Sequence, residues 1–219
     1  MGSCFLLDIV MRWIRFIGDI HADFETYKKL LWDYETIQVG DYGIGFGTPP
    51  EGNPIDPQKD QFIRGNHDDP LKCTLQKNWI ADGTFDGQIF FIGGAESIDR
   101  AYRIEGKSWW PEEELSHSDF YKIADSYSRI KPDIVVTHDA PDPICHYVLG
   151  RQIWDLSRTQ QALGALWAIH KPKLWIFGHY HKDFDGNYDG TRFVCLNINE
   201  TMDIDVDAIT ENRNKPTEL

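Results

Sequence analysis

Side chains of the types that bind divalent metal ions follow five short apolar segments of the chain. They are Asp19 and His21, Asp41, Asn66, His138, and His179 and His181. Residues two positions apart on an extended segment point the same way, so the first and last of these groups can each present a pair of ligands. Carboxylate, imidazole and amide oxygen suit Mn, Fe, Zn or Mg better than thiolate-preferring metals. The set exceeds one tetrahedral site and suits two ions that share a carboxylate.

The stretch from Arg64 to Asp68 combines a glycine, an amide, an imidazole and a carboxylate directly after the apolar pair Phe62-Ile63. The amide oxygen of Asn66 can bind a hard cation, and the adjacent His67 can donate a proton. These residue types are poor choices for a simple turn. We therefore expect this stretch to lie at the centre of a site.

Short strands are needed to bring these residues together. Apolar patterning predicts strands over residues 13–17, 36–39, 61–64, 133–137 and 173–177, each ending where the polar groups begin. A helix is predicted after the first strand, where Phe24, Tyr27, Leu30 and Leu31 form one apolar face. Alternation of this kind predicts an open α/β sheet, in which sites form at the carboxyl ends of the strands.

Further elements are predicted in the second half of the chain. Residues 84–85 and 88–92 read as a hairpin through Asp86-Gly87, and residues 191–196 read as another strand. Helices are predicted from Ser116 to before Pro132, and from Ser157 to about residue 170. Residues 109–111, Trp-Trp-Pro, are interpreted as packing or a lid. No repeat or linker divides the chain, so we expect one domain over residues 11–206, with terminal extensions at 1–10 and a polar, frayed 207–219.

Taken in order, these pieces resemble the signature of the calcineurin-like metallophosphoesterase superfamily. The matching segments are Gly-Asp-Ile-His at 18–21, Gly-Asp at 40–41, Gly-Asn-His-Asp at 65–68, Val-Thr-His at 136–138 and Gly-His-Tyr-His at 178–181. The resemblance covers residues 14 to 198, most of the chain. It implies an α/β fold, a four-layer α-β-β-α sandwich with two mixed β-sheets, and a binuclear metal centre at the strand ends.

The resemblance also implies a division of roles. One ion would be held by Asp19, His21, Asp41 and His181, and the other by Asp41, as the bridge, with Asn66, His138 and His179. His67 would contact the phosphate or protonate the leaving oxygen, while a metal-bound hydroxide attacks phosphorus in line. The two divalent ions are expected to be manganese, with Fe, Zn, Ni or Mg as alternatives. The implied function is hydrolysis of a phosphate monoester or diester.

The chain departs from one branch of the superfamily near Asp41. Protein phosphatases of this superfamily continue this motif to a second Asp, which orients the catalytic His, and then to a phosphate-binding Arg; here Ile44 and Gly45 stand at these positions. His67 therefore needs another partner, and Asp68, with Asp69 beside it, is the nearest acidic candidate. The candidates for a phosphate clamp are Arg64, Arg100 and Arg103. A surface salt bridge is an equal alternative for each of the three.

The composition of the chain limits the classes of partner that it can bind. The formal net charge is -13 over 219 residues, and such a surface repels nucleic acid and anionic membranes. The four cysteines are scattered singly, which is typical of a reducing compartment. No apolar run approaches the ~20 residues of a membrane-spanning helix. We therefore expect a cytoplasmic protein that acts on a small phosphate ester or nucleotide, whether Met1 or Met11 is its native start.

Alternatives remain open at this point. A phosphoprotein phosphatase would be expected to have the missing Asp-Arg pair, which favours small substrates or diesters. A non-catalytic binding scaffold with the same fold would be expected to lose ligands, and here every ligand position is filled. A nuclease is disfavoured by the acidic charge and the lack of a basic stripe. Patterning leaves the natural substrate, the metal and the oligomeric state undetermined.

Overall fold

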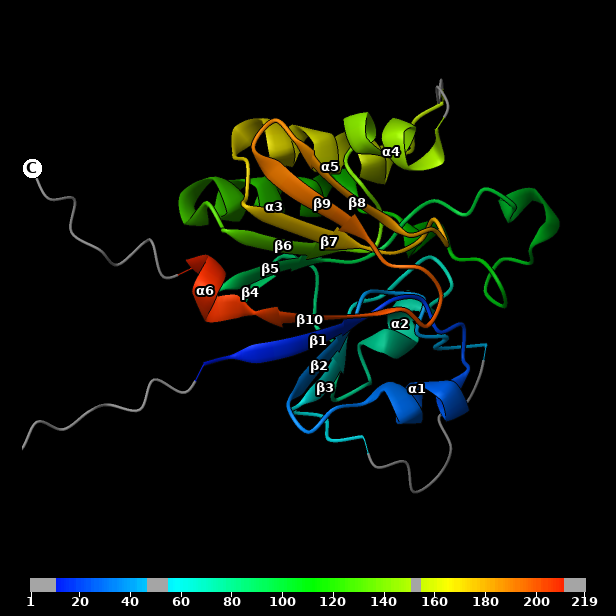
Figure 1. The fold of residues 1–219 in the computed structure, drawn as a ribbon. Coiled ribbons are helices and arrows are strands. Elements are labelled where there is room, and N and C mark those ends of the chain that lie inside the picture. Colours follow the sequence, from blue (N-terminus) through cyan, green and yellow to red (C-terminus); the bar gives the residue numbers. More distant parts are fainter. Residues whose placement is uncertain (1–10, 47–54, 151–154, 211–219) are drawn as a thin grey trace, which may run out of the picture.

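The structure is a computed structural model that describes residues 11–46, 55–150 and 155–210. It contains two β-sheets packed against each other, with helices on both outer faces (Figure 1). One sheet has the strand order β10-β1-β2-β3, and the other has the order β4-β5-β6-β7-β9-β8. The predicted four-layer α/β sandwich with two mixed sheets is confirmed.

The smaller sheet carries the first motifs. Strands β1 (Trp13–Ile17), β2 (Glu35–Gln38) and β3 (Asp60–Phe62) are parallel, and β10 (Thr201–Asp205) runs antiparallel beside β1. Helices α1 (Phe24–Leu30) and α2 (Pro70–Cys73) lie on its outer side (Figure 1). An aromatic cluster that includes Phe24, Tyr27, Tyr42 and Phe62 is buried there.

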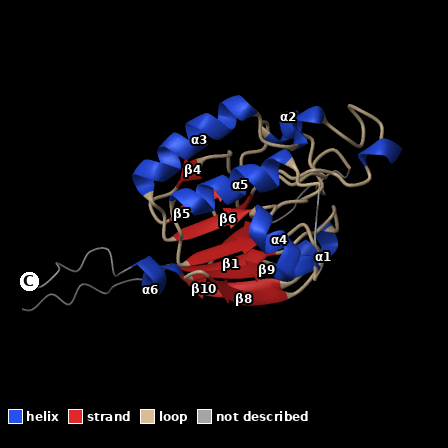
Figure 2. Ribbon diagram, turned by 90° about the horizontal axis from the view of Figure 1, so that it is seen from above, coloured by secondary structure: helices blue, strands red, loops and turns tan. Residues whose placement is uncertain are grey.

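The larger sheet carries the later motifs. Strands β5 (Ile89–Ile92), β6 (Ile134–Thr137), β7 (Leu174–Phe177) and β9 (Thr191–Cys195) are parallel, and β4 (Thr84–Phe85) and β8 (Phe184–Tyr188) are antiparallel edges. Helices α3 (His117–Ile130), α4 (Asp142–Leu149) and α5 (Arg158–Ile169) cover its outer face, as Figure 2 shows from above. The β5–β7 strands are buried along their whole length, so they read as continuous apolar runs.

A second apolar layer lies between the two sheets. It contains residues from both, including Ile14, Phe16, Ile37, Phe91, Val136 and Ile176. This layer holds β1 and β2 against β6 and β7. The motif residues that follow these strands are therefore carried by one packed core.

Several elements differ from the prediction. Helices α2 and α4 and strands β8 and β10 have no counterpart in the patterning. Helix α2 has only four residues and both strands are mostly polar, whereas α4 is a largely apolar helix of eight residues that follows Pro141. The predicted hairpin is confirmed as β4 and β5, although Phe85 pairs with Phe90, so its turn lies one residue later than Asp86-Gly87. The predicted helix starts after Ser116 and Ser157 are also confirmed.

The chain end also differs. Helix α6 (Val206–Thr210) continues the structure past residue 206, since Asp207 accepts hydrogen bonds from the Arg12 backbone at 2.7 Å and from Gln88 at 2.6 Å. No helix within the described residues is long and apolar enough to cross a membrane.

Candidate metal centre

The structure gathers all seven predicted ligands at one end of the sandwich. Asp19 follows β1, Asp41 follows β2 and Asn66 follows β3, while His138 and His179 follow the neighbouring strands β6 and β7 of the other sheet. Nδ1 of His138 lies 2.9 Å from the carbonyl oxygen of Val39, which ties the two sheets together at this edge. The parallel arrangement of the strands places their carboxyl ends side by side.

One group of ligands consists of Asp19, His21, Asp41 and His181. One ligand atom from each lies within 4.8 Å of all the others. Nε2 of His21 lies 2.9 Å from Nε2 of His181. At this distance one nitrogen must carry a proton and the other a lone pair, because two protons or two lone pairs would repel each other. The buried Oδ2 of Asp19 has no hydrogen bond of normal geometry among the described residues, although Nε2 of His181 lies 3.1 Å away. An unsatisfied buried carboxylate oxygen facing two imidazoles fits a divalent cation.

A second group adjoins the first through Asp41. Oδ1 of Asn66 lies 3.1 Å from Nε2 of His138 and 3.0 Å from Nδ1 of His179. Nε2 of His138 is also 3.3 Å from Oδ1 of Asp41, whose other oxygen lies 3.8 Å from His21. One carboxylate therefore faces both groups, and the donors of the second group, amide oxygen, carboxylate and two imidazoles, also fit a divalent ion.

Glycines are required at three of the motif positions. A Cβ on Gly40 would lie 2.3 Å from Nδ1 of His138, and one on Gly65 would lie 2.1 Å from Oδ1 of Asp41. A Cβ on Gly178 would lie 2.2 Å from Oδ1 of Asp19. Each glycine thus leaves room for a ligand that comes from a different strand.

The backbone of the site is held in unusual conformations. Positive φ angles occur at the non-glycine residues His21 (44°), Asp41 (57°), His179 (68°) and His181 (50°). Such conformations cost free energy and persist only where the surrounding structure imposes them, as at binding sites.

The electrostatics of the site favour added positive charge. Burial opposes protonation of His138, but the adjacent Asp41 carboxylate raises the pKa of this imidazole to about 10. Burial also works against ionisation of Asp41, yet His138, His67 and His21 hold its pKa well below the usual range. The adjacent Asp19 carboxylate raises the pKa of His181. The same buried carboxylates that favour a protonated imidazole beside them would also favour a bound cation.

His67 lies beside the two groups, next to Arg103. Its backbone N–H donates to Oδ1 of Asp41 at 2.7 Å, and Nη2 of Arg103 lies 2.8 Å from its Nε2. Burial and the charge of Arg103 outweigh Asp41 and lower the pKa of His67 to about 4. Arg103 is itself held by Asp99 at 2.6 Å and by the carbonyl of Ser108 at 3.1 Å. Among the three candidate arginines, this is the one that the structure places at the site.

Asp68 occupies a different position from the one expected for a partner of His67. Its buried carboxylate accepts backbone hydrogen bonds at 2.7–3.1 Å from Tyr42, Gly43, Ile44 and Gly65. The next residue, Asp69, caps helix α2. Asp68 therefore braces the loop after β2 against the loop after β3, instead of pairing with the imidazole of His67. The expected pairing was wrong because adjacent side chains point in different directions.

The other two candidate arginines, Arg64 and Arg100, form ion pairs away from the metal centre. The buried Arg64 pairs with Asp82 and donates to the carbonyls of Glu112 and Glu113 at 3.0 and 2.7 Å. Arg100 pairs with Glu96 at 2.8 Å on the surface. The salt-bridge alternative therefore holds for both.

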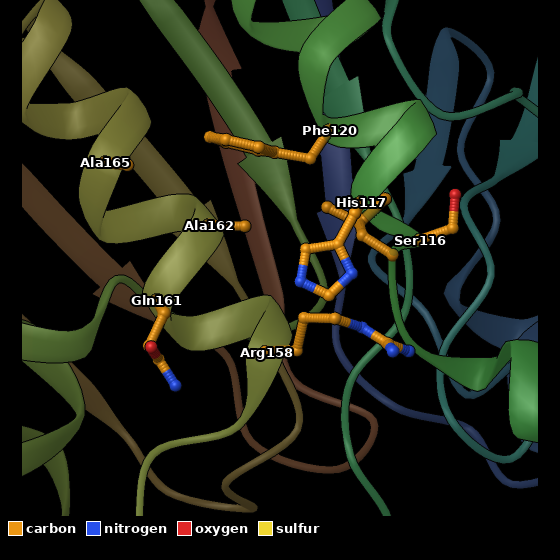
Figure 3. Close-up of a pocket in the computed structure, with 8 residues that line it drawn as sticks. Ser116, His117, Phe120, Arg158, Gln161, Ala162 and Ala165 are labelled. Carbon is orange, nitrogen blue, oxygen red and sulfur yellow. The ribbon is translucent and has the colours of Figure 1, made fainter.

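A cavity of about 520 Å³ opens beside the centre. It is lined by Asp41, Asn66, His67, Arg103, His179 and His181, together with apolar Ile98 and Leu149. A separate cavity of about 320 Å³ lies where helices α3 and α5 begin, lined by residues that include His117 and Arg158 (Figure 3). None of the motif residues lines the second cavity, whereas six of the site residues line the first.

Sequence comparison places the chain in a family. The model for calcineurin-like phosphoesterases matches residues 12–183, and the chain belongs to that family. The resemblance seen in the motifs is thereby confirmed. A search of curated proteins found no significant match.

Solved structures share the fold. The protein TT1561 of Thermus thermophilus has a TM-score of 0.51 and 12% identity, over 90% of this chain and 99% of that chain. A putative 5'-nucleotidase from Staphylococcus aureus, in complex with alpha-ketoglutarate, has a TM-score of 0.51 and 15% identity. That match covers 87% of this chain and 50% of the nucleotidase structure. At these identities the likeness concerns the fold alone.

Proposed function

We propose that this protein is a metal-dependent phosphoesterase that hydrolyses small phosphate esters at a centre of two divalent ions. The observation that carries the proposal is the position of Asp41. Its carboxylate faces Asp19, His21 and His181 on one side and His138 on the other. When bound, two divalent ions would activate water and stabilise the charge on the phosphoryl oxygens.

The residues of the chain itself would orient the ester. Arg103 would donate hydrogen bonds to the phosphoryl oxygens, since it lines the same cavity as Asp41, Asn66, His179 and His181. His67 would protonate the leaving oxygen. With a pKa of about 4, it is uncharged at neutral pH before substrate binds. An anionic phosphate beside the ring would raise that pKa, so the substrate itself helps to prepare its acid.

The size of the cavity supports a small substrate. Its volume of about 520 Å³ lies within the range of roughly 300–1,000 Å³ that small-molecule sites occupy. Ile98 and Leu149 give the cavity an apolar wall that could hold the alcohol part of the ester, as in a nucleotide. A phosphoprotein substrate is a weaker candidate because Ile44 and Gly45 replace the Asp-Arg pair. A monoester and a diester both fit this description.

Manganese as the resident metal and a cytoplasmic location remain predictions from the sequence. So does the absence of long nucleic acid among the substrates, which rests on the net charge of -13.

Turnover of model substrates tests the proposal. Metal-stripped protein is reloaded with Mn²⁺ and assayed with an aryl phosphate and with a bis-aryl phosphate, which separates monoesterase from diesterase activity. We expect turnover to depend on the metal and to be lost in His67→Ala. The same change at His117, which lies at the start of α3, is the control and should leave the rate unchanged.

The rival function is a binding scaffold that keeps the fold and the metal. It would be supported by protein that binds Mn²⁺ and yet hydrolyses neither ester. Full activity of the metal-stripped His67→Ala protein would contradict both the dependence of turnover on metal and the role of His67 as the acid.

A further inference from the structure

A chain of buried hydrogen bonds leads away from the metal centre to a carboxylate that belongs to none of the motifs. Nδ2 of Asn66 donates to Oγ of Ser97 at 3.0 Å, and Ser97 Oγ donates to Oε2 of Glu113 at 2.6 Å. The Ser97 backbone N–H donates to Oε1 of the same carboxylate at 2.8 Å. Both Ser97 and Glu113 come from the segment between β5 and α3, whose sequence shows no regular pattern.

The chemistry of these groups sets the direction of every bond. An ionised carboxylate can only accept, so the hydroxyl proton of Ser97 must point to Glu113. The hydroxyl oxygen then has lone pairs, and no proton, available for Asn66. The amide of Asn66 must accordingly turn its NH₂ group to Ser97 and its oxygen to His138 and His179. That is the orientation in which the amide can bind a cation.

The carboxylate is firmly placed. Glu113 is 2% exposed, and its Oε1 accepts a further hydrogen bond from Nε1 of Trp109 at 2.8 Å. Arg64 holds the backbone on either side by donating to the carbonyls of Glu112 and Glu113. A buried carboxylate is costly unless its oxygens are satisfied, and three donors satisfy this one.

We propose that Glu113 is a positioning residue that, through Ser97, fixes the Asn66 amide with its oxygen toward the second metal ion. The inference rests on the two-ion centre of the proposed function. Groups that orient metal ligands commonly contribute 10- to 100-fold to metal affinity. The effect should fall on the ion held by Asn66, His138 and His179, and much less on the ion held by Asp19, His21 and His181.

The test is calorimetric titration of metal-stripped protein with Mn²⁺, without substrate. Glu113→Gln is the main variant because an amide can donate to Ser97, which allows the hydroxyl to turn its proton toward Asn66. Ser97→Ala removes the relay, and Ser97→Thr keeps the hydroxyl. Glu112→Gln makes the same chemical change on an exposed neighbour and serves as the control. Thermal melting of each variant shows that it is folded.

We expect the wild type, Ser97→Thr and Glu112→Gln to bind two ions. Glu113→Gln and Ser97→Ala should bind one ion normally and the other roughly 10- to 100-fold more weakly. Unchanged affinity for both ions in folded Glu113→Gln and Ser97→Ala would overturn the inference. If the wild type itself bound fewer than two ions, the proposed centre would fail instead, so the two failures are distinct.

Discussion

Nη2 of Arg103 lies 2.8 Å from Nε2 of His67, and Nη1 of the same guanidinium lies 3.3 Å from Nδ1. The two residues come from loops of different sheets. Figure 1 shows the segment between β5 and α3, in green, extending beyond the sheets. A guanidinium delivered by this segment reaches the cavity even though Gly45 stands where the protein phosphatases of the superfamily have an arginine.

Arg103→Ala should lower kcat/KM for an aryl phosphate by about 100-fold, the typical effect of removing one hydrogen-bond donor from a developing negative charge. Steady-state kinetics of the Mn²⁺-loaded protein measures it. Arg100→Ala, three residues away and paired with Glu96 on the surface, is the control and should remain near the wild type. Equal activity of the two variants would show that Arg103 does not bind substrate.

Arg64→Met should act on stability and not on substrate binding. The variant leaves Asp82 without its ion-pair partner and frees two carbonyls, which we expect to cost about 3 kcal/mol of unfolding free energy. Arg129→Met, which breaks an exposed pair with Asp125, should cost less than about 1 kcal/mol. Urea unfolding compares the two. A raised KM with normal stability in Arg64→Met would contradict the structural role.

Gly178→Ala should weaken the binding of the ion held by Asp19, His21 and His181. The new methyl group would meet Oδ1 of Asp19 at 2.2 Å and displace the carboxylate from His21 and His181. A loss of about 10-fold or more in Mn²⁺ affinity is expected by calorimetry. Gly190→Ala in the turn between β8 and β9 meets nothing within 4 Å and strains only the local backbone (φ +87°), so its Mn²⁺ affinity should match that of the wild type. Equal affinities in both variants would mean that Asp19 is not a ligand.

Stability should depend on pH through Glu113. Burial raises the pKa of this carboxyl above its ordinary value of 4.5 in the folded protein. A raised carboxyl pKa means that folding favours the protonated form, so its contribution to stability is greatest at low pH and declines as pH rises through 4.5 toward the folded pKa. Relative to Glu113→Gln, metal-stripped wild type should therefore lose stability between acid and neutral pH in urea titrations. Parallel pH profiles of the two proteins would refute this.

Much of the fold could be predicted from the sequence, because its strands are short apolar runs that are followed directly by polar motif residues. The strands β1, β6 and β7 could be placed from their patterning alone. By contrast, β10 is half exposed and mostly polar, and pairing with β1 creates it as a strand. The polar residue Asp207 is held by Arg12 and Gln88, which are far away in the sequence, so no local signal marks α6.

The residues of the candidate metal centre could be identified for a similar reason, since their types and order are specific to the proposed chemistry. The residues that position them could not be predicted. Ser97 and Glu113 reach Asn66 only through the path of an irregular segment, and periodicity says nothing about such a path. The direction of the Asp68 side chain could not be predicted either, because adjacency to His67 in the sequence does not fix it; its carboxylate faces four backbone N–H groups.

The central claim is a centre of two ions that share Asp41. Anomalous diffraction from crystals of the Mn²⁺-loaded protein tests it most directly. We predict two peaks about 3.5–4 Å apart, one beside Asp19, His21 and His181 and the other beside Asn66, His138 and His179, with Asp41 between them. A single peak, or two peaks without Asp41 as a common ligand, would contradict the account.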